Sequence, residues 1–326
     1  MEPLKLKPAF QDYIWGGTRL RDEFGKESNL ERLAESWELS CHPSGQSVII
    51  NSVNKGMTLR DYLEQDWAVR VGEGAAKFSS FPVLIKLIDA CQDLSVQVHP
   101  DDRYAREHES GENGKTECWY VVDCDEGAVI AFGFNRALTK EEFRASIEND
   151  TLLDVVQLVP VNKGDVFFIE PGTLHAAGAG ILLAEIQQNS DITYRIYDYD
   201  RLGDDGQPRP LHTDKAVEVT KTWSAPPRRR RPSVIFDGYS ADVIADCQFF
   251  TTTELHITEE AAFPAPNGIS YTHLLCTEGD AALIYDEGVI MPIQKGDSVF
   301  LPANFGAYTI RSKDCTLLST QTLPRR

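Results

Sequence analysis

The residues from Leu94 to Asp102, LSVQVHPDD, combine a strand pattern with side chains that can bind a metal ion. Because side chains alternate along a strand, Ser95, Gln97 and His99 should point to one face. The aliphatic residues between them should point into a core, and the proline that follows should end the strand. The polar face therefore needs either water or a chemical role.

Two further segments supply candidate metal ligands. In GKTECWYVV, Lys115 and Glu117 share one face of an expected strand, and His175 follows a Pro-Gly turn. Together with Gln97 and His99, these residues give two imidazoles, a carboxylate and an amide oxygen. This mixed set suits Zn²⁺ with an open coordination position, or another divalent transition metal. Spacing alone also allows these to be ordinary structural residues.

The composition is that of a globular protein and argues against several partners. The 326 residues are 42% hydrophobic and 25% charged, with a formal net charge of −18. Such a field would repel nucleic acid and anionic membranes, so a phosphate-bearing ligand would need a local cationic pocket. No apolar run is long enough to span a bilayer, and the first residues, MEPLKLKPAF, lack the apolar core of a signal peptide. Seven scattered cysteines without a Cys-x-x-Cys pair favour a reducing, cytoplasmic location.

Most of the chain should form short strands separated by Gly, Pro, Asn and Asp, which is typical of barrels and sandwiches. The segments TLRDYLEQDWAVRVG and LTKEEFRASIENDTLLDVVQ have helical patterns, and Thr139 with Glu142 is a candidate capping box for the second. We therefore predict a mainly β fold with two barrel-like units and a small helical segment.

An internal repeat supports two units of similar design. NKGDVFFIEPGTLHA at 162–176 and QKGDSVFLPANFGA at 294–307 both read Lys-Gly-Asp, then an apolar strand, then a proline turn. Where the first copy has His175, the second copy, which is one residue shorter, has Gly306 or a neighbour. The second unit should therefore keep the scaffold without the metal ligand.

The division between the units should lie at SAPPRRRRPS, because prolines on both sides of four arginines are typical of an extended linker. We predict a catalytic, metal-binding unit at 1–225 with a short helical insertion near 139–157. A linker at 226–233 and a C-terminal barrel at 234–326 without metal ligands complete the expected organisation. The sequence gives no indication of the oligomeric state.

Several motifs in order give the chain a specific resemblance. LSVQVHPDD, GKTECWY, PGTLHA and YRIYDYDR, together with YIWGG and ESWELS near the start, resemble the type I phosphomannose isomerases of the cupin superfamily. The match runs from Met1 to about Lys215, and the second barrel fits the short bacterial form. The resemblance implies that the fold consists of two cupin-like, jelly-roll β-barrels with a small helical segment. Only 57 residues separate Glu117 from His175 (175 − 117 − 1), so the helical domain of the longer members must be reduced here.

The resemblance implies a set of roles. One zinc ion per chain would be held by Gln97, His99, Glu117 and His175, with Gln97 the least secure ligand because some short forms rely on three ligands. An essential arginine would match Arg195 and a catalytic lysine would match Lys115. The phosphate of a small sugar phosphate would be held by Ser95 and Arg201, an arginine where longer members have lysine.

The chemistry agrees with these roles. Interconverting mannose 6-phosphate and fructose 6-phosphate moves a proton between C2 and C1 through an enediol, so it needs a charge sink, a base and a phosphate anchor. Arg195 could stabilise oxyanion character, and Lys115 beside a cation could have a lowered pKa and transfer protons. Glu185 is a further acid, base or orienting candidate, and the sequence does not identify the base.

Two other interpretations remain open at this point. A non-haem iron oxygenase would use two histidines and a carboxylate, but such enzymes often have the acid two residues from the histidine, where this chain has Gln97. A non-catalytic cupin that only binds sugar phosphate or metal would not need Lys115 and Arg195 beside a full ligand set.

Overall fold

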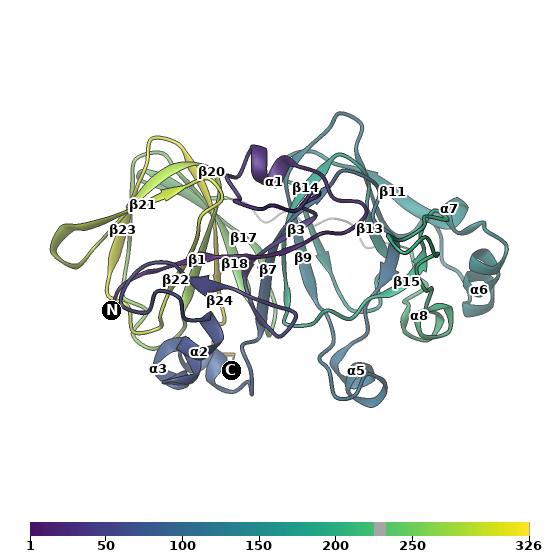
Figure 1. Ribbon diagram of the computed structural model, residues 1–326, viewed down its shortest axis with the longest axis horizontal. Coiled ribbons are helices and arrows are strands. Elements are labelled where there is room, and N and C mark those ends of the chain that lie inside the picture. The colour runs from purple at the N-terminus through teal and green to yellow at the C-terminus, as the bar shows by residue number, and fades with distance from the viewer. Residues whose placement is uncertain (225–232, 326) are drawn as a thin grey trace.

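The computed structural model describes residues 1–224 and 233–325. It has two β regions side by side along the long axis of the molecule, with the chain's C-terminal part in one and the candidate site residues in the other (Figure 1). The expectation of a mainly β chain is confirmed, whereas the closure of each region into a cupin-like barrel stays a prediction. No helix in the described part of the chain is both long and apolar enough to cross a membrane.

The N-terminal region contains two antiparallel sheets that face one another. The six-stranded sheet has the order β12 (Val166–Ile169), β9 (Glu117–Cys124), β14 (Ile181–Gln188), β7 (Val83–Ala90), β3 (Glu35–Leu39) and β2 (Ala9–Gln11). The five-stranded sheet has the order β11 (Val156–Pro160), β10 (Val129–Phe134), β13 (His175–Ala177), β8 (Val96–Val98) and β15 (Tyr194–Tyr197). A small hairpin pairs β4 (Cys41–His42) with β5 (Gly45–Gln46).

The C-terminal region is built on an eleven-stranded sheet. Its main path runs through β16 (Val234–Phe236), β17 (Tyr239–Asp246), β18 (Thr251–Ile257), β24 (Cys315–Gln321), β20 (Thr272–Tyr285) and β22 (Ser298–Leu301). The path then continues into two strands from the other end of the sequence, β1 (Leu4–Lys7) and β6 (Val48–Ile49). The strands β19 (Glu260–Phe263), β21 (Val289–Gln294) and β23 (Tyr308–Arg311) pair off this path, and a short 3₁₀ turn, η1 (Asp286–Gly288), precedes β21.

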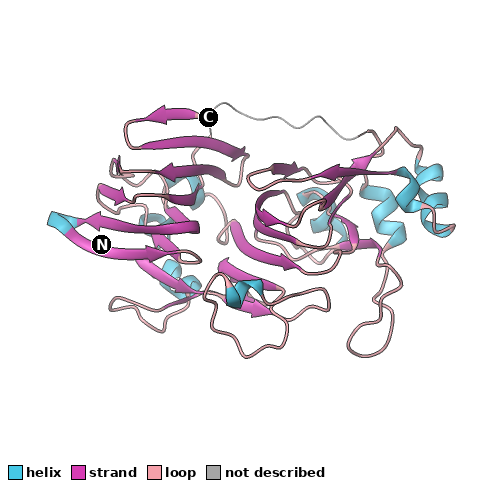
Figure 2. Ribbon diagram, turned by 90° about the horizontal axis from the view of Figure 1, so that it is seen from above, coloured by secondary structure: helices cyan, strands magenta, loops and turns pink. Residues whose placement is uncertain are grey.

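The helices are short and lie at the edges of the sheets. Figure 2 shows several of them gathered at the end of the molecule farthest from the C-terminal region. The helices are α1 (Arg19–Asp22), α2 (Leu59–Glu64), α3 (Trp67–Val71), α4 (Glu73–Ala76), α5 (Asp102–His108), α6 (Lys140–Glu148), α7 (Leu152–Val155) and α8 (Thr213–Val219). Thr139 caps α6 as expected, and both hydrogen bonds of the capping box with Glu142 are present.

Alternation along the strands explains where the cores lie. On β7, Ile85 and Leu87 belong to an apolar cluster that also contains Phe250 and Phe300 of the C-terminal region. Lys86, between them, points to the opposite face, into the space between the two N-terminal sheets. The six-stranded sheet is therefore covered on both faces, which accounts for eight consecutive buried residues in β7.

The predicted division of the chain stays a prediction. Most of the expected linker lies outside the described residues, and β1 and β6, although early in the sequence, are hydrogen-bonded into the C-terminal sheet. The helical segment near 139–157 is found as α6 and α7, and the chain already enters β11 at Val156.

Candidate metal centre and its charged surroundings

The polar face of β8 supplies one side of the site. Gln97 is paired with His175 on β13 and with Arg195 on β15, so these three side chains form a row across three strands. The opposite face of the same strand carries Val96 and Val98, which are buried in an apolar cluster. The alternation seen in the sequence therefore separates a core face from a face that points between the sheets.

Three of the expected ligands converge. His99, Glu117 and His175 are 1%, 0% and 0% exposed, and their ligand atoms all lie within 4.8 Å of one another. Nε2 of His175 is 3.0 Å from Oε1 of Glu117, and Nε2 of His99 is 3.6 Å from the same oxygen. They come from three different strands or strand ends, so the geometry depends on the pairing of the sheets and not on one local motif.

Hydrogen bonds at the far side of each ring fix the orientation of the two histidines. Nδ1 of His99 donates to the carbonyl of Ile192 at 2.7 Å, and Nδ1 of His175 donates to the carbonyl of Thr173 at 2.8 Å. In the neutral form of each ring, the unprotonated nitrogen is therefore Nε2, which lies toward Glu117. Burial, and then the charge of Lys115, lower the pKa of His99 to about 3, so this ring is neutral at pH 7.

The unpaired atoms show that the group fits a cation. Nε2 of His99 and one carboxylate oxygen of Glu117, Oε1, are buried and make no hydrogen bond in the described residues. Buried polar atoms left without a partner are costly, and a divalent ion would satisfy them together. Gln97 lies at the edge of this group, with its Nε2 3.4 Å from Nε2 of His175. Rotation of the Gln97 amide would present its oxygen to the same point.

A buried ion cluster lies behind the ligands. Nζ of Lys115 is 2.9 Å from Oε2 of Glu117 and 3.5 Å from Oε1 of Glu185. Nζ of Lys86 is 3.4 Å from the same Glu185 oxygen and 3.3 Å from Glu35. When all five side chains are ionised, three carboxylates face two ammonium groups, and the cluster carries one excess negative charge that favours a bound cation.

Two opposing effects, burial and the charges of neighbouring groups, set the direction of each pKa shift in this cluster. Burial alone would lower the pKa of Lys115, but Glu117 and Glu185 outweigh it and raise this pKa above the ordinary value. This differs from the lowered pKa that we expected beside a cation, because the neighbouring carboxylates were not visible in the sequence. Burial raises the pKa of Glu185, although Lys115 opposes this effect.

Two indole groups orient the carboxylates of the cluster. Nε1 of Trp119 donates to Oε2 of Glu185 at 2.7 Å, and Nε1 of Trp37 donates to Oε2 of Glu35 at 2.7 Å. Trp119 is also in edge contact with the ring of His175, with the ring centroids 5.1 Å apart. Hydrogen bonds therefore fix the orientation of Glu185 and Glu35, as they do for the two histidines.

Of the expected arginines, Arg195 lies on β15 of the other sheet, and Arg201 lies in the segment that follows this strand. Arg195 is half-buried, and its Nη1 donates to the carbonyl of Pro210 at 3.0 Å. Arg201 is bound to Asp198 at 2.6 Å and also donates to the carbonyl of Asp93. Ser95 is buried on the same face of its strand as Gln97.

Sequence reasoning missed three charged residues in these surroundings: Lys86, Glu35 and Arg209. Lys86 carried a usable signal, because a lysine inside VLIKLIDA must be either paired or functional if that strand is buried on both faces. Arg209 carried none, since it follows a loop of acidic and turn residues. Its contact with Asp198 arises only when the loop folds back.

Comparisons with known proteins agree with this geometry. Residues 4–127 match the family model described as phosphomannose isomerase type I, catalytic domain, and residues 241–321 match the one described as mannose-6-phosphate isomerase, cupin domain. The chain is 40% identical over 309 residues to the mannose-6-phosphate isomerase ManA of Bacillus subtilis, with 95% of this chain and 96% of that protein covered. It is 39% identical over 301 residues to the mannose-6-phosphate isomerase of Streptococcus mutans, covering 92% of each.

A solved structure shows the same arrangement. The crystal structure of the mannose 6-phosphate isomerase from Bacillus subtilis superposes with a TM-score of 0.92 at 37% sequence identity. The superposition covers 98% of this chain and 99% of that one. Both β regions therefore take part in the likeness, and not the candidate metal centre alone.

Proposed function

Since this chain belongs to the type I phosphomannose isomerase family, we propose that it interconverts mannose 6-phosphate and fructose 6-phosphate through an enediol. The observation that carries the proposal is the buried convergence of His99, Glu117 and His175 beside a protonated lysine and a half-buried arginine. This combination provides a cation site, a proton network and a charge sink within one enclosed space.

The proposed cofactor is one Zn²⁺ per chain, with Gln97 as a fourth ligand beside the two histidines and Glu117. The nitrogen and oxygen donor set and the single carboxylate support this choice. When bound, the ion would supply a Lewis acid for substrate oxygens. Of the four residues, Gln97 has the weakest support, because an amide is a weaker ligand than imidazole and water can replace it.

The remaining groups are assigned by their charge. Lys115, which keeps its proton because of Glu117 and Glu185, would act as an acid or as a cationic donor to a substrate oxygen. Glu185 has a raised pKa and contacts both buried lysines, so it would hold or pass a proton. Arg195 would stabilise the negative charge that develops on the enediolate oxygen.

The sugar phosphate would be oriented by groups farther along the barrel face. Ser95 is two residues from Gln97 on the same face of the strand, and Arg201 donates to the carbonyl of Asp93 at the start of that segment. We therefore place the phosphate beside Ser95 and Arg201, and the carbonyl end of the sugar beside the metal ligands. Two cupin-like barrels and a cytoplasmic location are part of the same proposal, and free thiols at all seven cysteines are consistent with a reducing compartment.

A coupled assay tests the proposal. Purified protein should convert mannose 6-phosphate to fructose 6-phosphate, contain about one zinc per chain, and lose activity when a strong chelator removes the metal. His99→Ala should lose both metal and activity, and Gln97→Ala should lose less of each. An active preparation without a stoichiometric divalent ion, or a metal-loaded protein without isomerase activity, would contradict it.

A further inference from the structure

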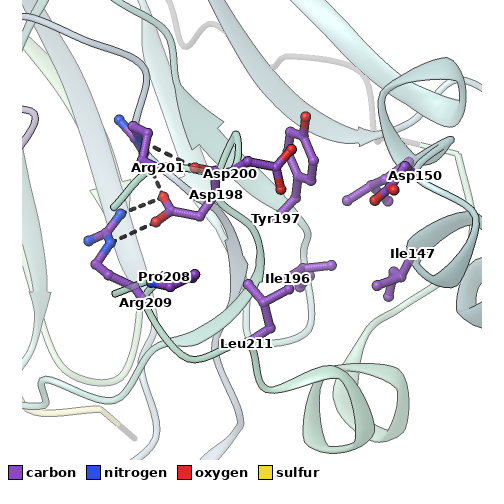
Figure 3. A pocket seen from close by; sticks show the side chains of 11 residues that line it. Ile147, Asp150, Ile196, Tyr197, Asp198, Asp200, Arg201, Pro208, Arg209 and Leu211 are labelled. Carbon is purple, nitrogen blue, oxygen red and sulfur yellow. Dashed lines mark hydrogen bonds and ion pairs between the residues drawn. The ribbon is translucent and has the colours of Figure 1, made fainter. Parts of the chain in front are cut away.

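A second carboxylate-centred cluster lies outside the metal centre, on the segment that follows β15. Asp198 accepts hydrogen bonds from two arginines: Nη2 of Arg201 at 2.6 Å, and Nε and Nη2 of Arg209 at 2.7 and 2.5 Å (Figure 3). The three side chains are 6%, 17% and 19% exposed for Asp198, Arg201 and Arg209. One carboxylate therefore holds two guanidinium groups in fixed positions, and the trio keeps one net positive charge.

Arg195 adds a third guanidinium to this cluster. Arg195 lies on β15, the strand that leads directly into Asp198. Burial lowers the pKa of Arg195, the charges of Arg209 and Arg201 add to this effect, and Asp198 opposes it. Nε of Arg195 is buried and makes no hydrogen bond to any described residue. Nη1 of Arg209 likewise has no partner within the described part of the chain, so two donors remain available for an anion.

The two sides of this cluster differ in charge. Alternation along β15 places Ile196 in the wall of a pocket that Asp198, Arg201 and Arg209 also line, together with Asp150 and Asp200 (Figure 3). Two arginines and three aspartates give this pocket a net charge of −1. These acidic side chains would repel an anion on that side. Arg195 lies on the opposite face, in the row with Gln97, so an anion would approach from the space between the sheets.

Strand pairing gives the order of the metal ligands, Arg195 and Asp198 along β8 and β15. His99 lies at the metal group just after β8, and Gln97 within β8 lies opposite both His175 and Arg195. Tyr197 pairs with Val96, so Asp198 follows at the level of Ser95. A substrate that reaches from the metal group past Arg195 would therefore place its other end near the arginine pair.

We propose that Arg209, held by Asp198, is a phosphate-binding residue that sets specificity for the dianion of a sugar 6-phosphate. This inference rests on the proposed isomerase function and deepens it. Two arginines, one aspartate and Arg195 carry a net charge of about +2, which matches a phosphomonoester dianion near pH 7. Asp198 acts as a positioning residue, since its contacts are with the arginines and not with the substrate.

The test compares Arg209→Gln with a variant of a second arginine, Arg32, which contacts the same loop through Asp204. Arg32→Gln removes a different arginine–aspartate pair, between Arg32 and Asp204 at 3.0 Å, and leaves the cluster intact. Arg209→Gln should raise KM for mannose 6-phosphate about 10- to 100-fold, the effect of losing one charge-assisted hydrogen bond. Its kcat and zinc content should change little, and the inhibition constant for inorganic phosphate should rise in parallel.

Two further variants and a neutral substrate make the test specific. Arg209→Lys should restore only part of the affinity, because lysine keeps the charge without the planar fork. Asp198→Asn should also raise KM, since both arginines lose their anchor. Turnover of mannose itself should not fall in Arg209→Gln, whereas Arg32→Gln should behave like the unmodified protein in every assay.

The outcomes separate this inference from the proposed function. If the unmodified protein fails to isomerise mannose 6-phosphate, the proposed function is wrong. If the unmodified protein is active and Arg209→Gln keeps its KM and its phosphate inhibition, the cluster is only structural and the inference is wrong. A fall in kcat with unchanged KM would also overturn it, because Arg209 would then act on the reaction and not on the phosphate.

Discussion

The N-terminal and C-terminal regions share one turn and differ in what the neighbouring strands carry. In the N-terminal copy, Asp165 accepts a hydrogen bond from the backbone of Asn162 at 2.8 Å, and in the C-terminal copy Asp297 accepts one from Gln294 at 2.8 Å. The glycines inside the two turns have φ of +83° and +88°. The Lys-Gly-Asp repeat in the sequence is therefore a repeat of structure.

Strand registers extend this equivalence to the site. Ile169 pairs with Glu117, and in the C-terminal region Leu301 pairs with Thr272. The next row places Lys86, Glu185 and Trp119 across three N-terminal strands. Its C-terminal counterpart contains Thr253, Ser319 and Leu274. The difference teaches that turns preserve the scaffold, whereas a few positions in the strand rows decide whether a region can hold a metal.

The largest effect should come from replacing a residue of the N-terminal site by the residue at the equivalent C-terminal position. Glu117→Thr should lose its stoichiometric metal, and kcat/KM should fall by about 10³-fold or more, because the only carboxylate among the proposed ligands is removed. Metal analysis and the coupled assay measure both effects. Thr272→Ser, at the equivalent C-terminal position, is the matched control and should keep metal and activity. Full metal content in Glu117→Thr would contradict the assignment.

The N-terminal edge strand β15 has no counterpart in the described part of the C-terminal region, where β19 pairs only with β23. Arg195 lies on β15 and therefore sharpens the comparison. If Arg195 stabilises charge that develops only in the enediolate, Arg195→Ala should lower kcat about 10²-fold and change KM far less. Steady-state kinetics at confirmed zinc content measure this. A raised KM with an intact kcat would instead make Arg195 a phosphate ligand.

The two copies of the shared turn should differ in how well they tolerate substitution of their glycines. A Cβ at Gly164 would meet no atom within 4 Å, whereas a Cβ at Gly296 would lie 2.4 Å from the carbonyl oxygen of Phe24. Gly164→Ala should cost about 1–2 kcal/mol in unfolding free energy from the positive φ alone, and Gly296→Ala should cost about 1–3 kcal/mol more. Denaturant titration of both variants tests this, and equal losses would show that the surroundings of the two turns do not differ energetically.

The smallest expected effect concerns a buried histidine in the C-terminal region. Burial, followed by the charge of Lys26, lowers the pKa of His273 to about 3. The unfolded chain therefore binds a proton at this histidine near pH 6.5, whereas the folded chain does not. The stabilisation present above pH 6.5 is lost as the pH falls toward 3. Between pH 6.5 and pH 5, the unfolding free energy of His273→Gln should fall by about 2 kcal/mol less than that of the unmodified protein. Its activity at pH 7 should be retained. Parallel pH dependence in both proteins would contradict this.

The parts of the site that could be predicted are those where a local pattern implies direction. Alternation in LSVQVHPDD predicted which face of β8 would carry Gln97 and His99, and the structure has His99 beside Glu117 and His175. The ion cluster could not be predicted, because the contact between Lys86 and Glu185 joins strands that are about 100 residues apart in the sequence (185 − 86 = 99). Strand order, which brings them together, has no local signature.

The C-terminal sheet could be predicted as a set of strands but not in its full extent. Nothing in Leu4–Lys7 distinguishes a strand that pairs nearby from one that pairs with the far end of the chain. The partner of β1 is β22, and the pairing is stabilised by the buried side chains of Leu4, Leu6 and Phe300 in a cluster that spans both regions. Long-range pairing of this kind depends on the packed whole and not on the strand itself.

This pairing also determines the order in which the protein can be completed during synthesis. Leu4 is paired with Phe300, so 295 residues (300 − 4 − 1) separate the two partners. At about 5–20 residues per second, the ribosome needs roughly 15–60 s to deliver the second partner after the first. Throughout that time the edge of β1 that pairs with β22 remains open to other strands. In a crowded cell, the early part of this chain should therefore be a client for chaperones until its last third has been translated.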